Sequence, residues 1–246
     1  MIRRSGEGDP LPALSFPRNW RIDTVVAFVR ALKLWHRPRL RGLEKVPPDR
    51  PLVYVGKHPR TWLYGETMLM SVLAFYDTHR VRPFHAMEKK GTSLHRAPVA
   101  AWIRRNTGAI EATEEAALAT LAAGDSVLIF PGGGRELYGP PDAIDWRGRR
   151  GYARIAARAG VPVVPFAMAG ADQQHPLRLK LGRSGSLWLP LLPLPVPIDY
   201  WFGAPIAPPP ADDAAAVARF ADEVATATQV LLARATTARR KPWSLR

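Results

Sequence analysis

Short apolar runs alternate with helical segments through the middle of this chain, and this alternation restricts the possible folds more than any other feature. The apolar runs are rich in β-branched residues and bounded by turn residues, which is typical of buried strands. Strands are predicted at residues 51–56, 81–86, 108–111, 127–130, 161–168 and 200–206. Helices are predicted at residues 67–76, 98–105, 114–123, 148–158 and 211–235. The pattern predicts an α/β fold with a largely parallel central sheet and helices on both faces.

The length of 246 residues suits a single domain of this kind. Residues 1–18 mix glycine, proline and charged residues without a period, and we interpret them as a flexible lead-in. Residues 19–238 are then the domain. Residues 239–246 are interpreted as a basic tail, which begins with Arg239, Arg240 and Lys241.

The composition favours an anionic partner. Lysine and arginine number 35 against 21 acidic residues, which gives a net charge of +14, so nucleic acid, a phospholipid surface and phosphorylated small molecules are all candidates. The absence of cysteine excludes disulfides and thiolate catalysis. Residues 1–12 lack the apolar centre of a secretory signal, and no apolar run is long enough to span a bilayer. We therefore expect a cytoplasmic protein that can still lie on a membrane.

Two apolar segments suit a membrane surface. Residues 19–37 place apolar side chains at helical spacing, with cations between them and Trp20 and Trp35 near the two ends. This pattern predicts an N-terminal amphipathic helix, which either lies on an anionic membrane or packs on the domain. Residues 187–198 are apolar but interrupted by prolines, so they can form neither a regular helix nor a central strand. Their apolar surface must face the core or a lipid.

A glycine-rich turn follows the strand predicted at residues 127–130. Gly132, Gly133 and Gly134 would allow main-chain N–H groups to face an anion or a developing oxyanion, and Arg135 adds a permanent charge. The turn lacks the Gly-Lys-Ser/Thr of a nucleotide-binding loop. The alternative interpretation is a strand-ending turn with a surface salt bridge.

His58 follows the strand predicted at residues 51–56, so it should emerge at the same sheet edge as the glycine-rich turn. A neutral imidazole can accept a proton at neutral pH, and a carboxylate would orient it. Glu66 is the nearest acid downstream and the predicted partner, while Asp77 is a weaker one. His85 is the alternative base, and a purely structural role for His58 also stays open. No two histidines have the spacing of a zinc motif, so no metal is expected.

Taken in order, these features resemble the glycerolipid acyltransferase superfamily, which includes the lysophosphatidate acyltransferases. The resemblance covers roughly residues 53–206 and lies in Lys57-His58, in residues 84–90, in Phe130-Pro131-Gly132-Gly133-Gly134-Arg135, in residues 161–165 and in residues 202–206. It implies that His58 is the general base on the acceptor hydroxyl. It also implies that Lys89 or Lys90 contacts a phosphate of the acceptor or of CoA.

Two positions depart from the superfamily pattern. Leu63 stands where the first block has Asp, which leaves Glu66 as the predicted charge partner of the histidine, and Gly132 stands where the third block has Glu. Both departures resemble the branch related to the diacylglycerol acyltransferases, where Pro-Gly-Gly is followed by a Glu, here Glu136. Residues 146–152 are similar to the Arg-Arg-Gly-Phe segment of that branch.

The resemblance implies an O-acyltransferase at a membrane surface. The acyl group would pass from acyl-CoA or acyl-carrier protein, as a co-substrate, to a hydroxyl of a glycerolipid or related lipid. The expected catalytic residues are His58 and Glu66, and the expected substrate-binding residues are Lys89, Lys90, Gly132, Gly133, Gly134, Arg135 and Glu136. We expect no bound cofactor and a peripheral position on the cytoplasmic side of an anionic membrane. A specific nucleic-acid partner is not expected, because the aromatic and basic residues do not alternate as in a known binding module. The alternative is a catalytically inactive protein on the same fold that binds lipids or membranes.

Overall fold

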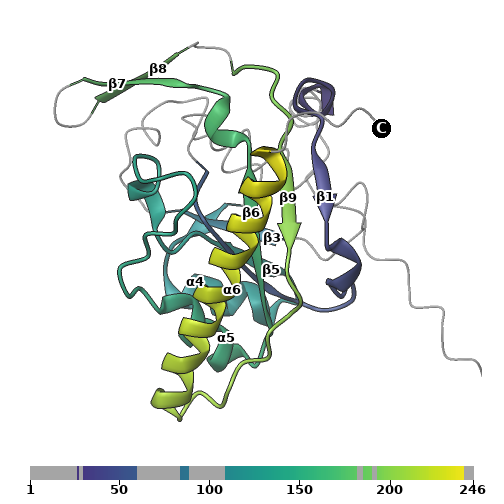
Figure 1. Cartoon of the computed structure of the whole chain (residues 1–246). Coiled ribbons are helices and arrows are strands. Elements are labelled where there is room, and N and C mark those ends of the chain that lie inside the picture. Colours follow the sequence, from purple (N-terminus) through teal and green to yellow (C-terminus); the bar gives the residue numbers. More distant parts are fainter. Residues whose placement is uncertain are drawn as a thin grey trace, which may run out of the picture.

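The computed structural model of this chain describes residue 27 and residues 30–59, 84–88, 109–181, 185–189 and 193–240 (Figure 1). Its centre is a seven-stranded sheet with the order β1-β9-β6-β2-β5-β3-β4. The strands are β1 Arg39–Arg41, β2 Val53–Gly56, β3 Phe84–Glu88, β4 Ile110–Glu111, β5 Ser126–Ile129, β6 Val163–Ala169 and β9 Asp199–Phe202. The five strands from β6 to β4 are parallel to one another. β9 pairs with β6 in antiparallel orientation, and β1 pairs with β9 in parallel orientation. The predicted α/β class and the largely parallel sheet are confirmed.

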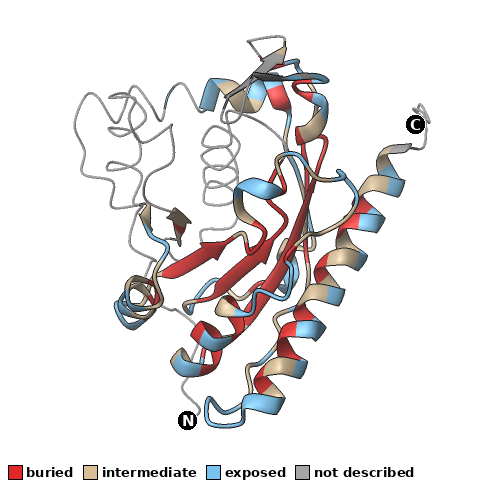
Figure 2. Ribbon diagram, turned by 90° about the vertical axis from the view of Figure 1, so that its left-hand side faces the viewer, coloured by how far each residue is buried: buried red, intermediate tan, exposed pale blue. Residues whose placement is uncertain are grey.

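The middle strands of the sheet are buried on both faces, as their apolar runs predict. Every residue of β2, β5 and β6 is buried, and Figure 2 shows the central strands of the described part of the chain in the colour of buried residues. Alternate residues of β2 point to opposite faces. Val53 and Val55 belong to one apolar cluster, and Tyr54 belongs to the other.

In the described part of the chain, three α-helices pack on the face of the sheet that carries Val53 and Val55. They are α4 Glu114–Ala122, α5 Gly151–Ala159 and α6 Ala214–Arg240. The Thr113 side chain caps α4 by accepting from the main-chain N–H of Ala116, and Gly160 ends α5 with a left-handed φ of 64°. The helices predicted at residues 67–76 and 98–105, and the start of the predicted N-terminal helix, lie outside the described residues. The last part of the predicted N-terminal helix is described, and it is helical at residues 30–36.

Several boundaries differ from the sequence predictions. α6 continues to Arg240, so Arg239 and Arg240 belong to this helix rather than to a tail. The three-residue strand β1 and the antiparallel hairpin of β7 Leu177–Leu181 and β8 Gly185–Leu189 were not predicted. β8 contains the start of the proline-interrupted segment, and it pairs with β7 in a separate two-stranded sheet rather than in the central one. The last central strand ends at Phe202, and only an isolated bridge joins Ile206 to β6.

None of the helices in the described part of the chain combines the length and the apolar character needed to cross a bilayer.

Candidate active site

The carboxyl ends of β2 and β5 lie side by side at one edge of the sheet. The two strands pair in parallel, with Val55 opposite Ile129, so the residues that follow each strand emerge together. Lys57 and His58 follow β2 and are both buried. The glycine-rich loop follows β5, and the main-chain N–H of His58 donates to Oε2 of Glu136 in this loop at 2.7 Å. The structure therefore brings His58 and the loop together.

The environment of His58 keeps its imidazole neutral. Nδ1 lies 2.9 Å from the carbonyl oxygen of Pro59, and because a carbonyl only accepts, Nδ1 carries the proton and Nε2 keeps its lone pair. Burial lowers the pKa of His58 to about 4; the bond to Pro59 acts in the opposite direction, and the charge of Lys57 adds to the lowering. The ring packs against Phe130, with the ring centres 5.0 Å apart. An unprotonated Nε2 at neutral pH is what a general base requires.

Glu136 is fully buried and connects His58 to a second loop. Its Oε2 accepts from the N–H of His58, and its Oε1 accepts from the N–H of Asp145 at 3.0 Å. Burial raises the pKa of Glu136, while the two N–H groups and the charge of Lys57 act in the opposite direction. The sequence predicted that Glu136 contacts the substrate. In the structure its carboxylate instead faces main-chain donors inside the protein.

Glycine is needed at position 132 because there is no room for a side chain, not because of the backbone conformation. Its φ of −67° is accessible to any residue, but a Cβ at this position would overlap the side chain of Glu136. Gly133 differs, because its φ of +57° lies in the left-handed region that favours glycine. Gly134 has open space around the place of a Cβ. Gly132 and Gly133 therefore have separate reasons to be glycine, whereas nothing around position 134 requires one.

Arg149 holds the glycine-rich loop from outside. Its Nη1 donates to the carbonyl oxygens of Pro131 and Gly132, at 2.8 and 3.1 Å. Within the loop, the N–H of Gly133 donates to the carbonyl oxygen of Phe130 at 3.0 Å. Arg135 lies on the one-turn helix η3 Gly133–Arg135 and is exposed. The loop thus has a fixed main chain and an exposed cation at its tip.

Of the remaining predicted residues, the structure describes only His85. Glu66, Asp77, Lys89 and Lys90 lie outside the described residues, so the structure gives no geometry for them. His85, the alternative base, lies inside β3, where its Nε2 is 3.1 Å from Oδ2 of Asp125. It pairs with the second residue of β5, toward the amino end of the strands, whereas His58 lies beyond their carboxyl end.

The sequence interpretation gave no role to three residues that shape the site: Lys57, Asp145 and Arg149. Lys57 is 5% exposed, although lysine is rarely buried. A lysine directly between a buried strand and a histidine was the signal in the sequence. Arg149 was noted only as part of a resemblance, and the main-chain contact of Asp145 leaves no mark in the sequence.

A buried neutral histidine next to a glycine-rich loop, at the carboxyl edge of a parallel sheet, defines an α/β protein with a candidate site for group transfer. The chain matches the model of the Acyltransferase family over residues 37–169, more than half of its length. The protein belongs to this family.

Similar proteins cover most of the chain. An uncharacterised protein of Mycobacterium tuberculosis is 26% identical over 234 residues, which are 85% of this chain and 64% of that protein. A 1-acyl-sn-glycerol-3-phosphate acyltransferase of Chlamydomonas reinhardtii is 31% identical over 154 residues, 58% of this chain and 41% of that one. A human DGAT1/2-independent enzyme synthesizing storage lipids is 26% identical over 221 residues, 81% of this chain and 62% of that one. The chain therefore spans less than two thirds of the length of these curated relatives.

The crystal structure of the 1-acyl-sn-glycerophosphate acyltransferase PlsC from Thermotoga maritima has the same fold. The TM-score is 0.58 at 19% identity, and the match covers 91% of this chain and 81% of that one.

Proposed function

We propose that this protein is an O-acyltransferase that moves an acyl group from acyl-CoA or acyl-carrier protein to a hydroxyl of a glycerolipid acceptor on the cytoplasmic side of a membrane. The observation that carries the proposal is the contact of a buried neutral His58 with the glycine-rich loop, in a chain of the Acyltransferase family. The names of two relatives, an acyltransferase for 1-acyl-sn-glycerol-3-phosphate and an enzyme of storage-lipid synthesis, support a lipid acceptor.

His58 acts as the general base. Its Nε2 accepts the proton of the acceptor hydroxyl while the hydroxyl oxygen bonds to the thioester carbonyl carbon. The C–S bond then breaks, and the leaving thiolate takes the proton from the imidazolium to give a free thiol. Because a buried imidazolium with a pKa of about 4 is unstable on its own, the negative charge on the carbonyl oxygen must develop as the proton moves. Proton transfer and C–O bond formation are therefore coupled.

The loop supplies the groups that face this developing charge. The N–H of Gly133 is used within the loop, so the donors to the oxyanion are the N–H groups of Gly132 and Gly134. Arg135, exposed on η3, binds a phosphate of the acceptor or donor. Lys89 and Lys90 are proposed as further phosphate contacts, and Glu66 as the carboxylate that orients His58.

Glu136 is a positioning residue in this scheme. Its carboxylate holds the main chain of His58 at 2.7 Å and that of Asp145 at 3.0 Å. It therefore sets the distance between the base and the oxyanion donors without touching the substrate. Positioning of this kind can account for a large part of a rate enhancement.

Substitution of His58 tests the proposal. His58→Ala is expected to lower acyl transfer from acyl-CoA to 1-acyl-glycerol-3-phosphate by roughly two to four orders of magnitude, measured as release of free CoA thiol. His85→Ala is the matched control, because it removes another imidazole, one that lies toward the other end of the strands. Full activity of a folded His58→Ala protein would overturn the assignment. Wild-type protein that binds lipid vesicles but transfers no acyl group from either donor would support the catalytically inactive alternative.

A further inference from the structure

Exposed apolar side chains are concentrated in one region of the molecule. Among the residues whose side chains the structure describes, seven large hydrophobic residues are exposed, and five of them lie in three segments. These are residues 30–36, the loop 193–198 and β7, and the five side chains are Leu34, Trp35, Leu177, Leu179 and Leu194. The other two, Tyr138 and Val230, lie on the glycine-rich loop and on α6. Such a concentration marks an interaction surface.

Hydrogen bonds join the three segments. Trp35 Nε1 donates to the carbonyl oxygen of Pro193 at 2.9 Å. The N–H of Leu194 donates at 2.9 Å to the carbonyl oxygen of Gln174, three residues before β7 begins. Figure 1 shows the helical segment before β1 and the β7–β8 hairpin at the same end of the molecule. We call the five apolar side chains, together with Lys33 and Arg37, the docking surface.

The docking surface is also basic. A cavity of about 560 Å³ is lined by Lys33, Arg37, Pro38, Arg39 and Pro197. The buried acid next to it, Asp199, is already balanced by Arg39 and Arg239, at 2.7 and 2.8 Å. The charged residues described in the lining of the cavity are thus cations, and an anionic group would complement them.

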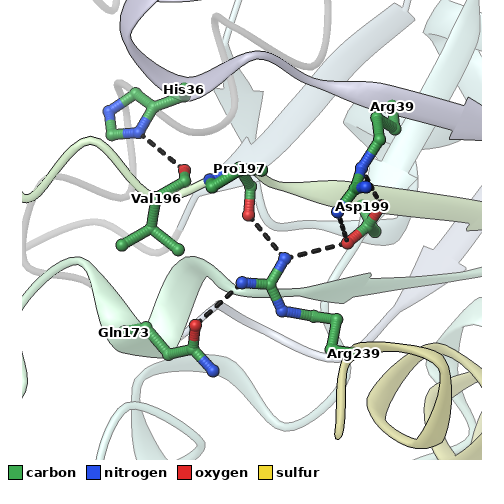
Figure 3. A network of polar contacts seen from close by, with 7 residues as sticks. All are labelled: His36, Arg39, Gln173, Val196, Pro197, Asp199 and Arg239. Carbon is green, nitrogen blue, oxygen red and sulfur yellow. Dashed lines mark hydrogen bonds and ion pairs between the residues drawn. The ribbon is translucent and has the colours of Figure 1, made fainter. Parts of the chain in front are cut away.

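Side chains of Arg239 and His36 hold the loop of the docking surface in place, as Figure 3 shows. Arg239 donates to the carbonyl oxygen of Pro197 at 2.7 Å and to Oε1 of Gln173 at 2.8 Å. His36 Nδ1 lies 3.2 Å from the carbonyl oxygen of Val196. The apolar side chains of this loop are thus presented from a fixed main chain.

The docking surface lies at the sheet edge that carries the candidate active site. β9 runs antiparallel to β6, and its first residue, Asp199, pairs with Ala169, the last residue of β6. β6 pairs in parallel with β2, whose carboxyl end leads to His58. The start of β9, the end of β6 and His58 therefore share one edge, and a membrane bound there would bring lipid to the site.

We infer that this surface docks on an anionic phospholipid bilayer. The leucines enter the boundary between headgroups and acyl chains, Trp35 lies at the headgroup level, and Lys33 and Arg37 face lipid phosphates. The inference rests on the proposed function in one respect, namely that the acceptor is a membrane lipid. Charge complementarity and the shared edge favour a membrane over a second copy of the chain.

Flotation with vesicles of phosphatidylcholine and phosphatidylglycerol tests the surface. Leu179→Glu is expected to weaken binding by roughly tenfold or more, because a leucine that would enter the bilayer is replaced by a charged side chain. Val230→Glu is the matched control, because Val230 is 43% exposed and Leu179 is 44% exposed, and it should bind like the wild type. Lys33→Gln and Arg37→Gln should each weaken binding about fivefold, while Arg219→Gln, an exposed arginine on α6, should have no effect. Equal binding by the Leu179→Glu and Val230→Glu proteins would overturn the inference.

A second measurement separates this inference from the proposed function. Leu179→Glu should lower acyl transfer to an acceptor embedded in vesicles but leave transfer to a dissolved short-chain acceptor unchanged. If the wild-type protein transfers no acyl group to either acceptor, the proposed function fails, whereas the vesicle-binding result still decides on the docking surface. A wild-type dimer in the absence of lipid that Leu179→Glu converts to a monomer would assign the surface to a second copy of the chain instead.

Discussion

Two carboxylates are buried at the same edge of the central sheet, and the protein stabilises them by different means. Asp199 lies between two arginines, with Arg39 Nε 2.7 Å from Oδ1 and Arg239 Nη1 2.8 Å from Oδ2. Glu136 is held by two main-chain N–H groups, one of which is that of His58. The charges of two arginines balance Asp199, whereas main-chain N–H groups hold Glu136.

This difference separates two roles. The partners of Asp199 come from β1 and from the end of α6, so this carboxylate ties together elements that are distant in the chain (Figure 3). The partners of Glu136 belong to the candidate site, so any shift of this carboxylate moves His58. Burial raises the pKa of Glu136, and an arginine partner would have had the opposite effect. We therefore expect that changing Glu136 affects catalysis and that changing Asp199 affects stability.

Of the changes at the two carboxylates, Glu136→Ala is expected to have the largest effect. The change leaves the buried N–H of His58 and the partly buried N–H of Asp145 without their acceptor, which should lower the free energy of unfolding by about 2–3 kcal/mol. The main chain of His58 is then no longer held, and a small displacement of a catalytic group can lower turnover on the order of 100-fold. Urea unfolding and kcat measured on the folded protein separate the two effects. A folded Glu136→Ala protein with normal kcat would contradict the positioning role.

A second change, at Gly132, tests whether the position of the carboxylate matters. An ideal Cβ at position 132 lies 2.5 Å from Oε2 of Glu136, about the span from the Cβ of an aspartate to its own carboxylate oxygens. Gly132→Asp should destabilise the wild type, because it overlaps the Glu136 side chain. In Glu136→Ala the same aspartate should restore part of the activity, by about tenfold, since it returns a carboxylate to the emptied space. A double variant no more active than Glu136→Ala would show that the carboxylate position is not what matters.

Asp199→Asn should have the next largest effect, and on stability alone. Asparagine keeps the shape but removes the charge that balances Arg239, whose side chain is 14% exposed. The free energy of unfolding should fall by about 2 kcal/mol, while kcat of the folded protein stays within about threefold of the wild type. If kcat fell as far as in Glu136→Ala, the contrast between the two carboxylates would be wrong.

The position of His58 beside the glycine-rich loop could be predicted, because the carboxyl ends of neighbouring parallel strands meet at one edge. The inward position of the Glu136 side chain could not. Whether its side chain turns inward depends on the space beside Gly132, and this space is visible only once the loop is folded. In the sequence, a glutamate next to Arg135 in a glycine-rich turn suggested a substrate contact.

The surroundings of Asp199 were unpredictable for a different reason. Arg239 is 40 positions away along the chain, and its neighbours Arg240 and Lys241 suggested a solvated tail. β1 has only three residues, too few to show a period of two. Contacts between short segments that are distant in the chain form only in the completed sheet. The βαβ alternation, in contrast, can be predicted from the local sequence of each apolar run.

The pH dependence of the unfolding free energy tests the burial of His58 itself. Its pKa is lowered from 6.5 to about 4, so the unfolded chain binds a proton before the folded protein does. The stability due to the buried neutral imidazole is therefore present above pH 6.5 and is lost as the pH falls toward 4, by at most about 1.4 kcal/mol per pH unit. The difference in unfolding free energy between wild type and His58→Asn, measured across this range, isolates the effect from other groups.

The pH dependence of kcat/KM tests the lowered pKa of His58 and distinguishes the two carboxylates. In the wild type the acid limb should lie near pH 4 rather than near 6.5, because protonation of the free enzyme's base removes activity. Glu136→Ala, which loosens the main chain of His58 and lets water approach the ring, should move this limb toward 6.5. Asp199→Asn should leave it in place, since its contacts do not involve His58. A limb near 6.5 in the wild type would mean that the reacting histidine is not buried as the structure has it.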